Sequence, residues 1–218
     1  MIKKFFDFSF SLFGIIFSLP VWFLISLAIL IEDGWPVLYS QDRVGKGGRI
    51  FKAFKFRSMI KGAEEDTGPI QASEDDSRVT RVGRVLRATA MDELPQLFNI
   101  FRGDISFVGP RALRLEEREV RDNTSRKAFD YPNFNERSKV KPGLTGIAQV
   151  FAPRDISREK KFEYDIWYIK NRSFRLDVYL IILSFLITFN ERWEVRRDKL
   201  TLLGGRLKQE VQSHLGES

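Results

Sequence analysis

An uncharged run of 24 residues, from Phe8 to Ile31, limits what this chain can fold into more than any other feature. A helix of that length rises about 36 Å at ~1.5 Å per residue, enough to cross the ~30 Å hydrocarbon core of a membrane. Lys3 and Lys4 precede the run, as in a signal peptide, but no small-x-small cleavage site precedes Glu32. The run therefore predicts a helix that stays inserted in a membrane.

Pro20 divides this run into two halves of 12 residues. Each half is about 18 Å long as a helix, little more than one leaflet. The proline removes one backbone hydrogen bond and kinks the helix, and we expect Ser18 to help satisfy the freed carbonyl. Basic residues lie before the run and again at 43–49, so the charge asymmetry that orients a spanning helix is absent. These residues leave two topologies open, a kinked span and a hairpin-like dip into one leaflet.

The charge and the missing residue types narrow the chemistry. The net charge of +7 indicates an anionic partner, which could be nucleic acid, a phosphorylated small molecule or an anionic membrane surface. The chain has no cysteine, which excludes disulfides, thiolate zinc sites and cysteine nucleophiles. Its one histidine, His214, lies four residues from the C-terminus, so a histidine general base is not expected. Catalytic groups must come from carboxylates, Lys, Ser, Thr or Tyr.

The next segments predict two strands around a glycine-rich turn, over Val37–Gln41 and Arg49–Arg57. Lys55 and Arg57, two residues apart, are expected on the same face of the second strand. The turn at Gly45–Gly48 lacks the spacing of a phosphate-binding loop and opens no helix. A simple turn is therefore the better interpretation.

Four later segments complete a fold of the α+β class that is mostly helical. Arg111–Asp130 is dense in charge of both signs and predicts an exposed helix. Lys141–Gly146 has the composition of a turn, and Arg158–Asn171 fits an amphipathic helix. Val178–Phe189 carries no charge but is too short to span, so it predicts either a core helix or one lying at the membrane interface. At 218 residues, one folded domain is expected beside the membrane segment.

An adjacent carboxylate pair, Asp92 and Glu93, precedes a Leu-Pro step. Pro95 favours the first turn of a helix, so we expect a helix over 94–101 with both carboxylates at its N-terminal end. Capping alone could explain the pair. An arginine every third residue over 78–87 comes before it, however, and Arg111 follows it. Carboxylates among phosphate-binding cations suggest a divalent metal shared with phosphate, and thus phosphoryl transfer at a membrane surface.

The run Asp76–Arg111, which contains Asp-Glu-Leu-Pro, closely resembles the bacterial sugar transferases, the monotopic phosphoglycosyl transferases that initiate glycoconjugate assembly. Phe54–Met59, Lys141–Gln149 and Lys160–Asp165 also resemble blocks of this family, in the family's order. The likeness covers almost the whole chain. It implies a re-entrant membrane helix over 1–34, a small cytoplasmic catalytic domain over 35–205 that has a short β-hairpin and interfacial amphipathic helices, and a polar tail over 206–218.

The resemblance implies transfer of a sugar 1-phosphate from a UDP-sugar to undecaprenyl phosphate, with release of UMP and a requirement for Mg²⁺. Asp92 would be the nucleophile and a metal ligand, and Glu93 would support it. Five basic residues would hold phosphates or substrate: Lys55, Arg57, Arg87, Arg111 and Arg154. The family breaks its membrane helix at a Ser-Pro pair, whereas this chain has Ser18-Leu-Pro20, with the serine displaced by one residue.

The same resemblance implies residence in the bacterial inner membrane, with the catalytic domain facing the cytoplasm. Anionic lipids are expected partners, a homodimer is an open option, and no nucleic acid is expected. The segment Phe151–Ser157 departs from the family text, so we predict that it helps select the sugar or nucleotide. Two alternatives remain at this point, a non-catalytic basic membrane scaffold and a membrane-tethered nucleic-acid-binding module, although no nucleic-acid-binding motif is present.

Overall fold

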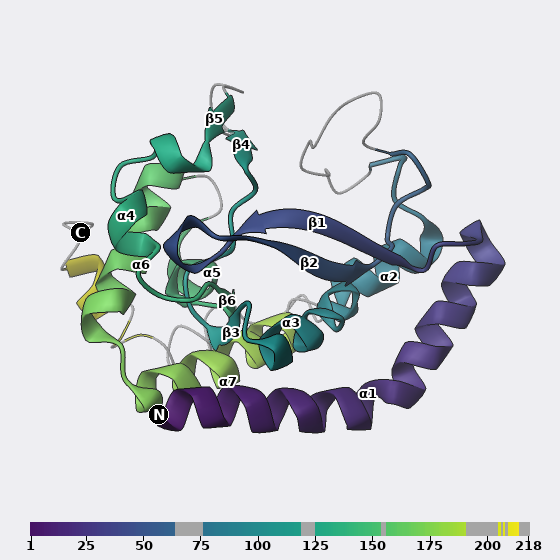
Figure 1. The fold of residues 1–218 in the computed structure, drawn as a ribbon, viewed down its shortest axis with the longest axis horizontal. Coiled ribbons are helices and arrows are strands. Elements are labelled where there is room, and N and C mark those ends of the chain that lie inside the picture. Colours follow the sequence, from purple (N-terminus) through teal and green to yellow (C-terminus); the bar gives the residue numbers. More distant parts are fainter. Residues whose placement is uncertain are drawn as a thin grey trace.

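The structure, a computed structural model, describes residues 1–63, 76–118, 125–153, 156–190, 205, 207 and 209–213. Helices dominate it, and the strands form three small sheets, in agreement with the predicted mostly helical α+β class (Figure 1). In chain order the elements are α1 (Ile2–Asp33), β1 (Leu38–Val44), η1 (Lys46–Gly48), β2 (Ile50–Phe56), α2 (Arg81–Ala88), η2 (Met91–Glu93), α3 (Gln96–Arg102), β3 (Ser106–Val108), β4 (Glu116–Arg118), β5 (Ser125–Lys127), η3 (Ala128–Asp130), α4 (Phe134–Arg137), β6 (Gly143–Thr145), α5 (Ile147–Phe151), α6 (Arg158–Asn171) and α7 (Phe174–Asn190), where η marks a 3₁₀ turn.

The predicted hairpin is confirmed. Strands β1 and β2 pair antiparallel, with a register that runs from Leu38 opposite Phe56 to Val44 opposite Ile50. The turn between them contains Gly47 and Gly48, both in the left-handed region that glycine adopts at little cost. The observed second strand ends at Phe56, one residue before Arg57.

Two sequence-based predictions are wrong. Where the structure describes residues 111–130 they form no α-helix; they hold the antiparallel pair β4 and β5, followed by the 3₁₀ turn η3. Glu116 lies opposite Lys127 across this pair, so charges of opposite sign suit cross-strand pairing as well as a helix surface. The segment 141–146 is not only a turn, because it contains β6, which pairs in parallel with β3.

Helix α1 bends near its middle and wraps around one side of the domain (Figure 1). Pro20 lies inside the helix and accounts for the bend, since it has no N–H to bond the Ile16 carbonyl and its ring crowds the preceding turn. Ser18 Oγ instead donates to the Ile15 carbonyl at 3.2 Å, so the expectation that Ser18 satisfies the freed carbonyl is wrong. By length and composition α1 could cross a membrane.

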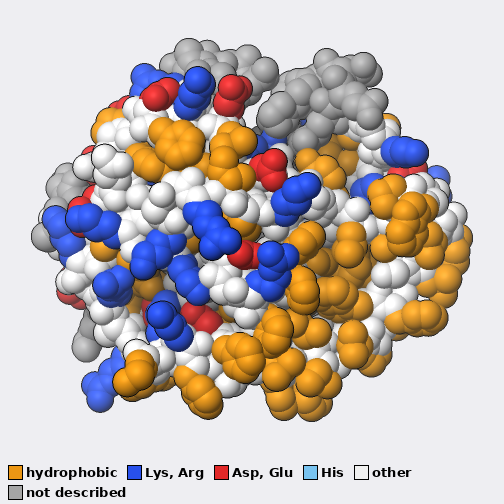
Figure 2. Space-filling view, in the orientation of Figure 1, with side chains coloured by type: hydrophobic (Ala, Val, Ile, Leu, Met, Phe, Trp, Pro, Cys, Tyr) orange, Lys and Arg blue, Asp and Glu red, His pale blue; other side chains and the backbone are white. Residues whose placement is uncertain are grey.

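The first half of α1 packs on α3, where Gly14 allows a close approach to Leu97, and lies beside α7 (Figure 1). Large apolar side chains cover the outer surface of α1, including Phe13, Phe17 and Phe23. In Figure 2 the apolar surface occupies the bottom and right of the face in view, and Lys and Arg gather beside it. This distribution suits a surface that meets a membrane at its basic margin.

The main core lies between α5, α6 and α7. Helix α6 has the predicted bounds and buries Tyr164, Trp167 and Tyr168. Leu180 of α7 is buried in the same core, whereas Phe185 on α7 is exposed, so α7 has both an inward and an outward side. Val211 is also fully buried there, hence the segment predicted as a polar tail over 206–218 is part of the core at that residue.

Candidate active site

The carboxylate pair lies on a short turn between α2 and α3. Asp92 and Glu93 form the end of η2, and α3 begins after Pro95, as the sequence predicts to within two residues. Ala90 has φ of 53°, in the left-handed region, and thereby reverses the chain between α2 and η2. The side chains of Asp92 and Glu93 are 11% and 28% exposed, so both are mostly withdrawn from water but reachable.

Lys55 of β2 bridges the two carboxylates. Its Nζ lies 2.5 Å from Glu93 Oε1 and 3.6 Å from Asp92 Oδ2. Lys55 shares a strand face with Phe51 and Ala53, which pack against α3. That packing aims Lys55 at the turn where α3 begins, so the hairpin and the carboxylate turn are held in one site.

The two carboxylates differ electrostatically. Burial raises the pKa of Asp92, the adjacent Glu93 charge adds to this effect, and Lys55 and Arg87 offset it only in part. Burial alone would also raise the pKa of Glu93, but Lys55, Arg111 and Arg43 together outweigh burial and hold that pKa below its ordinary value. Glu93 is therefore stabilised as an anion, whereas Asp92 is the more basic carboxylate.

Arg87 reaches the pair from α2. Its Nε donates to Ser58 Oγ at 2.9 Å, just beyond the hairpin. Gly83 makes this approach possible, because a Cβ at that position would lie 2.0 Å from the Ser58 carbonyl oxygen. Thr80 caps the start of the helix, and its Oγ1 accepts a hydrogen bond from the Gly83 N–H. Helix α2 thus presents Arg87 from a fixed position.

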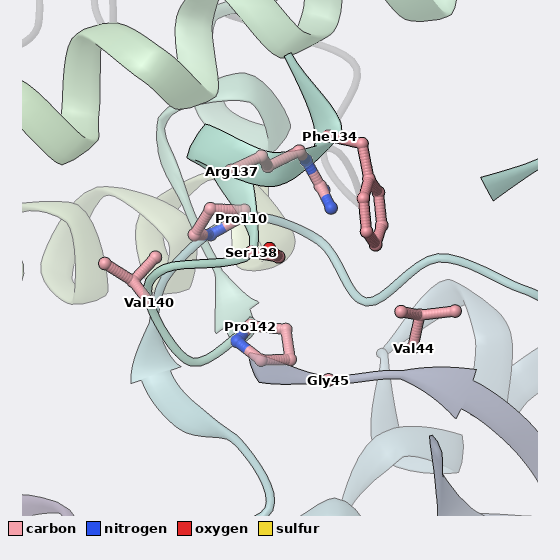
Figure 3. A pocket seen from close by; sticks show the side chains of 8 residues that line it. All are labelled: Val44, Gly45, Pro110, Phe134, Arg137, Ser138, Val140 and Pro142. Carbon is pink, nitrogen blue, oxygen red and sulfur yellow. The ribbon is translucent and has the colours of Figure 1, made fainter. Parts of the chain in front are cut away.

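Arg111 approaches from the other side, after β3, and its side chain is exposed. Its carbonyl oxygen accepts a hydrogen bond from Arg137 of α4, and Arg137 Nε in turn donates to the buried Asp165 at 2.7 Å. Burial raises the pKa of Asp165, and the Arg137 charge opposes this. Figure 3 shows the Arg137 side chain pointing into a small pocket lined by Val44, Gly45, Pro110, Phe134, Ser138, Val140 and Pro142. This pocket adjoins the backbone that carries Arg111.

Two predicted substrate-binding residues, Arg57 and Arg154, are not among the residues that the structure describes around Asp92 and Glu93. Arg57 is 7% exposed and points to the end of α1, where its Nη2 donates to the carbonyl oxygens of Asp33 and Gly34 at 2.7 Å each. It also pairs with the Asp33 carboxylate at 2.9 Å. The structure therefore gives Arg57 a structural partner where the sequence predicts a phosphate. Arg154 lies outside the described residues, as does part of the Phe151–Ser157 segment.

Asn99 is a residue of this site that sequence reasoning missed. Its side chain is fully buried in α3, where Oδ1 accepts from the Phe54 N–H at 3.0 Å and Nδ2 donates to the Lys52 carbonyl at 2.7 Å. These bonds join the free edge of β2 to α3 and so set the position of Lys55 relative to the carboxylates. The available signal was a polar residue in the Asp-Glu-Leu-Pro-Gln-Leu-Phe-Asn run, at a position that faces the core.

The carboxylate oxygens of Asp92 and Glu93 suit a hard cation such as Mg²⁺ only when a substrate supplies further ligands. Among the residues that the structure describes, no three Asp, Glu, His or Cys side chains form a metal-binding group. Asp92 and Glu93 provide carboxylate oxygens at one place, and Mg²⁺ commonly takes one or two carboxylates together with substrate phosphates and water. The pair therefore fits Mg²⁺ as a shared ion and does not form a protein-only cage.

A family model described as "Bacterial sugar transferase" matches residues 1–191, which include every described element of this site. The chain belongs to the bacterial sugar transferase family. This bacterial sugar transferase is 41% identical over 165 residues to the UDP-N-acetylgalactosamine-undecaprenyl-phosphate N-acetylgalactosaminephosphotransferase of Aeromonas hydrophila, a match that covers 74% of this chain and 37% of the relative.

Two further relatives differ in length. The UDP-glucose:undecaprenyl-phosphate glucose-1-phosphate transferase of Klebsiella pneumoniae is 39% identical, over 76% of this chain and 35% of the relative. The uncharacterized sugar transferase EpsL of Bacillus subtilis (strain 168) is 37% identical, over 84% of this chain and 85% of the relative. This chain thus spans little more than a third of the Aeromonas and Klebsiella proteins, and most of EpsL.

Proposed function

We propose that this chain is a membrane phosphoglycosyl transferase that moves a sugar 1-phosphate from a UDP-sugar to undecaprenyl phosphate and releases UMP. The observation that carries the proposal is the pair of buried Asp92 and half-buried Glu93 bridged by Lys55, with Arg87 and Arg111 close enough to shift the carboxylate pKa values. The names of the Aeromonas and Klebsiella relatives supply the classes of donor and acceptor.

The proposed reaction has two steps and a covalent intermediate on Asp92. In the first, a carboxylate oxygen of Asp92 attacks the β-phosphorus of the UDP-sugar, the bond from that phosphorus to the bridging oxygen breaks, and UMP leaves with that oxygen. In the second, a phosphate oxygen of undecaprenyl phosphate attacks the same phosphorus and the bond to Asp92 breaks. The Asp92 carboxylate is regenerated, so the cycle is balanced and ping-pong.

Asp92 suits the attacking role better than Glu93 does. Glu93 is held at 2.5 Å by Lys55, while Asp92 is 3.6 Å from the same ammonium group. The raised pKa of Asp92 also means a more basic, more nucleophilic oxygen once it is ionised. Glu93, whose pKa is lowered, remains an anion that orients Lys55.

Cations must offset the repulsion between a carboxylate and an anionic diphosphate. Lys55 of β2, Arg87 of α2 and Arg111 after β3 act electrostatically on the pair and can bind the phosphate oxygens. Asp92 and Glu93 are the residues that would hold Mg²⁺, which would supply charge neutralisation for the departing UMP. Arg57 is not part of this proposal, because Asp33 already pairs with it.

The bend in α1 offers a route for the lipid acceptor. Leu94, next to Glu93, packs against the cluster that contains Trp22 and also against the one that contains Ile15. These two residues flank Pro20, so the bend lies beneath the carboxylate turn. An acceptor phosphate at the membrane surface beside the bend would then reach Asp92 without leaving the membrane.

We further propose that α1 enters one leaflet and returns, with Met1 and the domain both on the cytoplasmic side of the bacterial inner membrane. Both ends of α1 bond to the same domain, which supports this topology: Lys3 pairs with Asp177 at one end, and Asp33 pairs with Arg57 at the other. A straight spanning helix would separate Lys3 from Asp177 by the thickness of the membrane. Anionic lipids would meet the basic margin of the apolar surface (Figure 2).

UMP release tests the function directly. Purified protein in lipid nanodiscs is mixed with a panel of UDP-sugars, with and without undecaprenyl phosphate, and with Mg²⁺ or EDTA. The proposal expects UMP from at least one donor, at stoichiometric amount without acceptor and in multiple turnovers with it, and loss of both in EDTA. No UMP from any donor would favour a non-catalytic scaffold.

A further inference from the structure

The last turn of α1 caps the first turn of another helix. Glu32 accepts hydrogen bonds from the backbone N–H groups of Arg81 at 2.7 Å and Val82 at 2.9 Å, at the start of α2. A helix leaves its first N–H groups without partners inside the helix, so their acceptors must come from elsewhere. Thr80 supplies the acceptor for the third of these groups, the N–H of Gly83. Glu32, 49 positions before Arg81, supplies the acceptors for the first two.

Helix α2 depends on such outside support. It has eight residues, and an isolated helix of that length is marginal in water. Its own first turn contains no acidic residue that would complement the positive end of the helix dipole, and the carboxylate of Glu32 takes that place. Hydrogen bonds from N–H groups to a carboxylate are stronger than those to a neutral acceptor. The direction of α2 therefore depends on where the last turn of α1 lies.

Apolar packing joins α2 to the same half of α1. Leu86 of α2 is 3% exposed and belongs to one hydrophobic cluster with Ile25 and Ile29 of α1. Like Glu32, these two isoleucines follow the bend at Pro20. The second half of α1 and helix α2 thus form one packed unit, joined by a buried apolar contact and by a carboxylate cap.

The far end of α2 carries Arg87, whose charge acts on Asp92. A second support holds α2 independently of α1, because the Ser58 carbonyl accepts from the Thr80 N–H at 3.2 Å and Ser58 Oγ accepts from Arg87 Nε at 2.9 Å. Arg81 and Arg87 are about 9 Å apart along the helix axis at ~1.5 Å per residue. A tilt of the first turn of α2 therefore displaces the Arg87 guanidinium group.

We propose that Glu32 is a positioning residue for donor binding: it holds the start of α2 on the last turn of α1 and thereby sets Arg87 beside the carboxylate pair. The second half of α1 then contributes to the phosphate-binding geometry and is not only an anchor. Glu32 contacts no reacting atom and acts through α2. The inference rests on the proposed function, in which Arg87 binds phosphate oxygens of the UDP-sugar.

The kinetics of Glu32→Ala in nanodiscs test this role. We expect the KM for the UDP-sugar to rise about fivefold or more, while the KM for undecaprenyl phosphate and the UMP burst at saturating donor stay near their wild-type values. Glu32→Asp keeps the carboxylate and should recover part of the loss. Glu163→Ala, which removes an exposed carboxylate from α6, is the matched control and should behave as wild type. A smaller burst with an unchanged donor KM would indicate a merely structural role and overturn the proposal.

A double variant tests whether the effect passes through Arg87. If it does, Glu32→Ala should raise the donor KM much less in an Arg87→Met background than in the wild type, because the group that Glu32 positions is already gone. Equal fold-changes in the two backgrounds would show that Glu32 acts by another route, and the proposal would be wrong.

Hydrogen exchange of the backbone amides provides a readout that needs no activity. Glu32→Ala should speed exchange over residues 84–88 about threefold or more, because α2 loses one of its two supports, whereas Glu163→Ala should not. Exchange as slow as in the wild type would mean that Ser58 alone holds α2, which contradicts the proposal. The two proposals fail separately: absence of UMP release by the wild type would refute the proposed function, and exchange would still decide whether Glu32 holds α2.

Discussion

Lys55 Nζ lies 2.5 Å from Glu93 Oε1, and this contact makes the two adjacent carboxylates, Asp92 and Glu93, electrostatically different. The ammonium group is committed mainly to Glu93 and is 3.6 Å from Asp92. Adjacent residues in a 3₁₀ turn such as η2 point about 120° apart, since it has ~3 residues per turn, so they cannot occupy equivalent positions around one phosphorus. The geometry thus separates a paired anion from a freer, more basic one.

Replacement of each carboxylate should therefore have a different effect. Asp92→Asn preserves the shape but removes the attacking charge, so we expect multiple-turnover UMP release to fall about 10³-fold or more. The single-turnover burst without undecaprenyl phosphate should vanish. Glu93→Gln should be severely impaired yet retain a slow burst.

Mass spectrometry of wild-type peptides after reaction with donor alone should find the phosphosugar on Asp92. Its presence on Glu93, or UMP release only after acceptor is added, would refute this mechanism.

Asn99→Ala should separate Lys55 from the carboxylates. The substitution leaves the Phe54 N–H and the Lys52 carbonyl without their buried partner. We expect a loss of about 2–4 kcal/mol in the free energy of unfolding, since each unsatisfied buried group costs ~1–3 kcal/mol. UMP release by the folded fraction should also fall. Phe98→Ala, at an exposed neighbour on α3, is the control and should cost less in both measurements; equal effects would exclude a special role for Asn99.

Gly83→Ala should displace Arg87. A Cβ at residue 83 would lie 2.0 Å from backbone oxygen of Ser58, which cannot move aside as a flexible side chain can. We expect a loss of about 1–3 kcal/mol from overpacking and a raised KM for the UDP-sugar. Val85→Ala, on an exposed position of the same helix, should leave KM unchanged. An unchanged KM in Gly83→Ala would mean that Arg87 does not need this helix position.

Local signals predicted the elements whose stability is local. Ser157 caps α6 through the Lys160 N–H, and the apolar spacing of that helix is regular, so its bounds were predicted correctly. The glycines between β1 and β2 likewise identified the hairpin. The Asp-Glu-Leu-Pro turn located the start of α3 because proline restricts where a helix can begin.

Contacts between residues far apart in the chain determine the structural features that the sequence pattern did not predict. Lys55 and Arg57 are two residues apart, yet the strand ends between them, and Asp33 of α1 forms an ion pair with Arg57. Residues 111–130 have mixed charges that suit a helix surface, but where the structure describes them Glu116 lies opposite Lys127 across β4 and β5. Nothing in the pattern near Lys3 indicates Asp177, 174 positions away. Such partners depend on packing between distant elements.

The contact between Glu32 of α1 and the start of α2 should make the stability of the protein depend on pH. Its carboxylate accepts bonds from the N–H groups of Arg81 (2.7 Å) and Val82 (2.9 Å) at the start of α2. Slight burial opposes the effect, but these bonds keep its pKa below the ordinary value of 4.5. The folded state then binds this proton less readily than the unfolded state does. Glu32 therefore contributes stability above pH 4.5 that disappears as the pH falls through the lower, folded pKa.

The pH dependence of unfolding by denaturant checks this. Between about pH 5 and pH 3 the wild type should lose more stability than Glu32→Gln, because the amide does not titrate. Glu163→Gln, at an exposed position of α6, is the control and should follow the wild-type curve. If the Glu32→Gln and wild-type curves are parallel over this range, Glu32 does not hold the two helices through its charge.

Pro20→Leu should straighten α1 and expose the N-terminus. Leucine restores the N–H that can bond the Ile16 carbonyl and removes the ring that crowds the preceding turn, so a continuous helix becomes favourable. A straight α1 cannot keep both Lys3 on Asp177 and Asp33 on Arg57, so one of these pairs must break. With cysteines placed singly at residues 2 and 46, the wild type should protect both from an external, membrane-impermeant reagent. Pro20→Leu should raise labelling at residue 2 alone, whereas Leu19→Ala, a neighbouring control that leaves the kink, should not; labelling of residue 2 already in the wild type would establish a spanning helix and rule out the re-entrant topology.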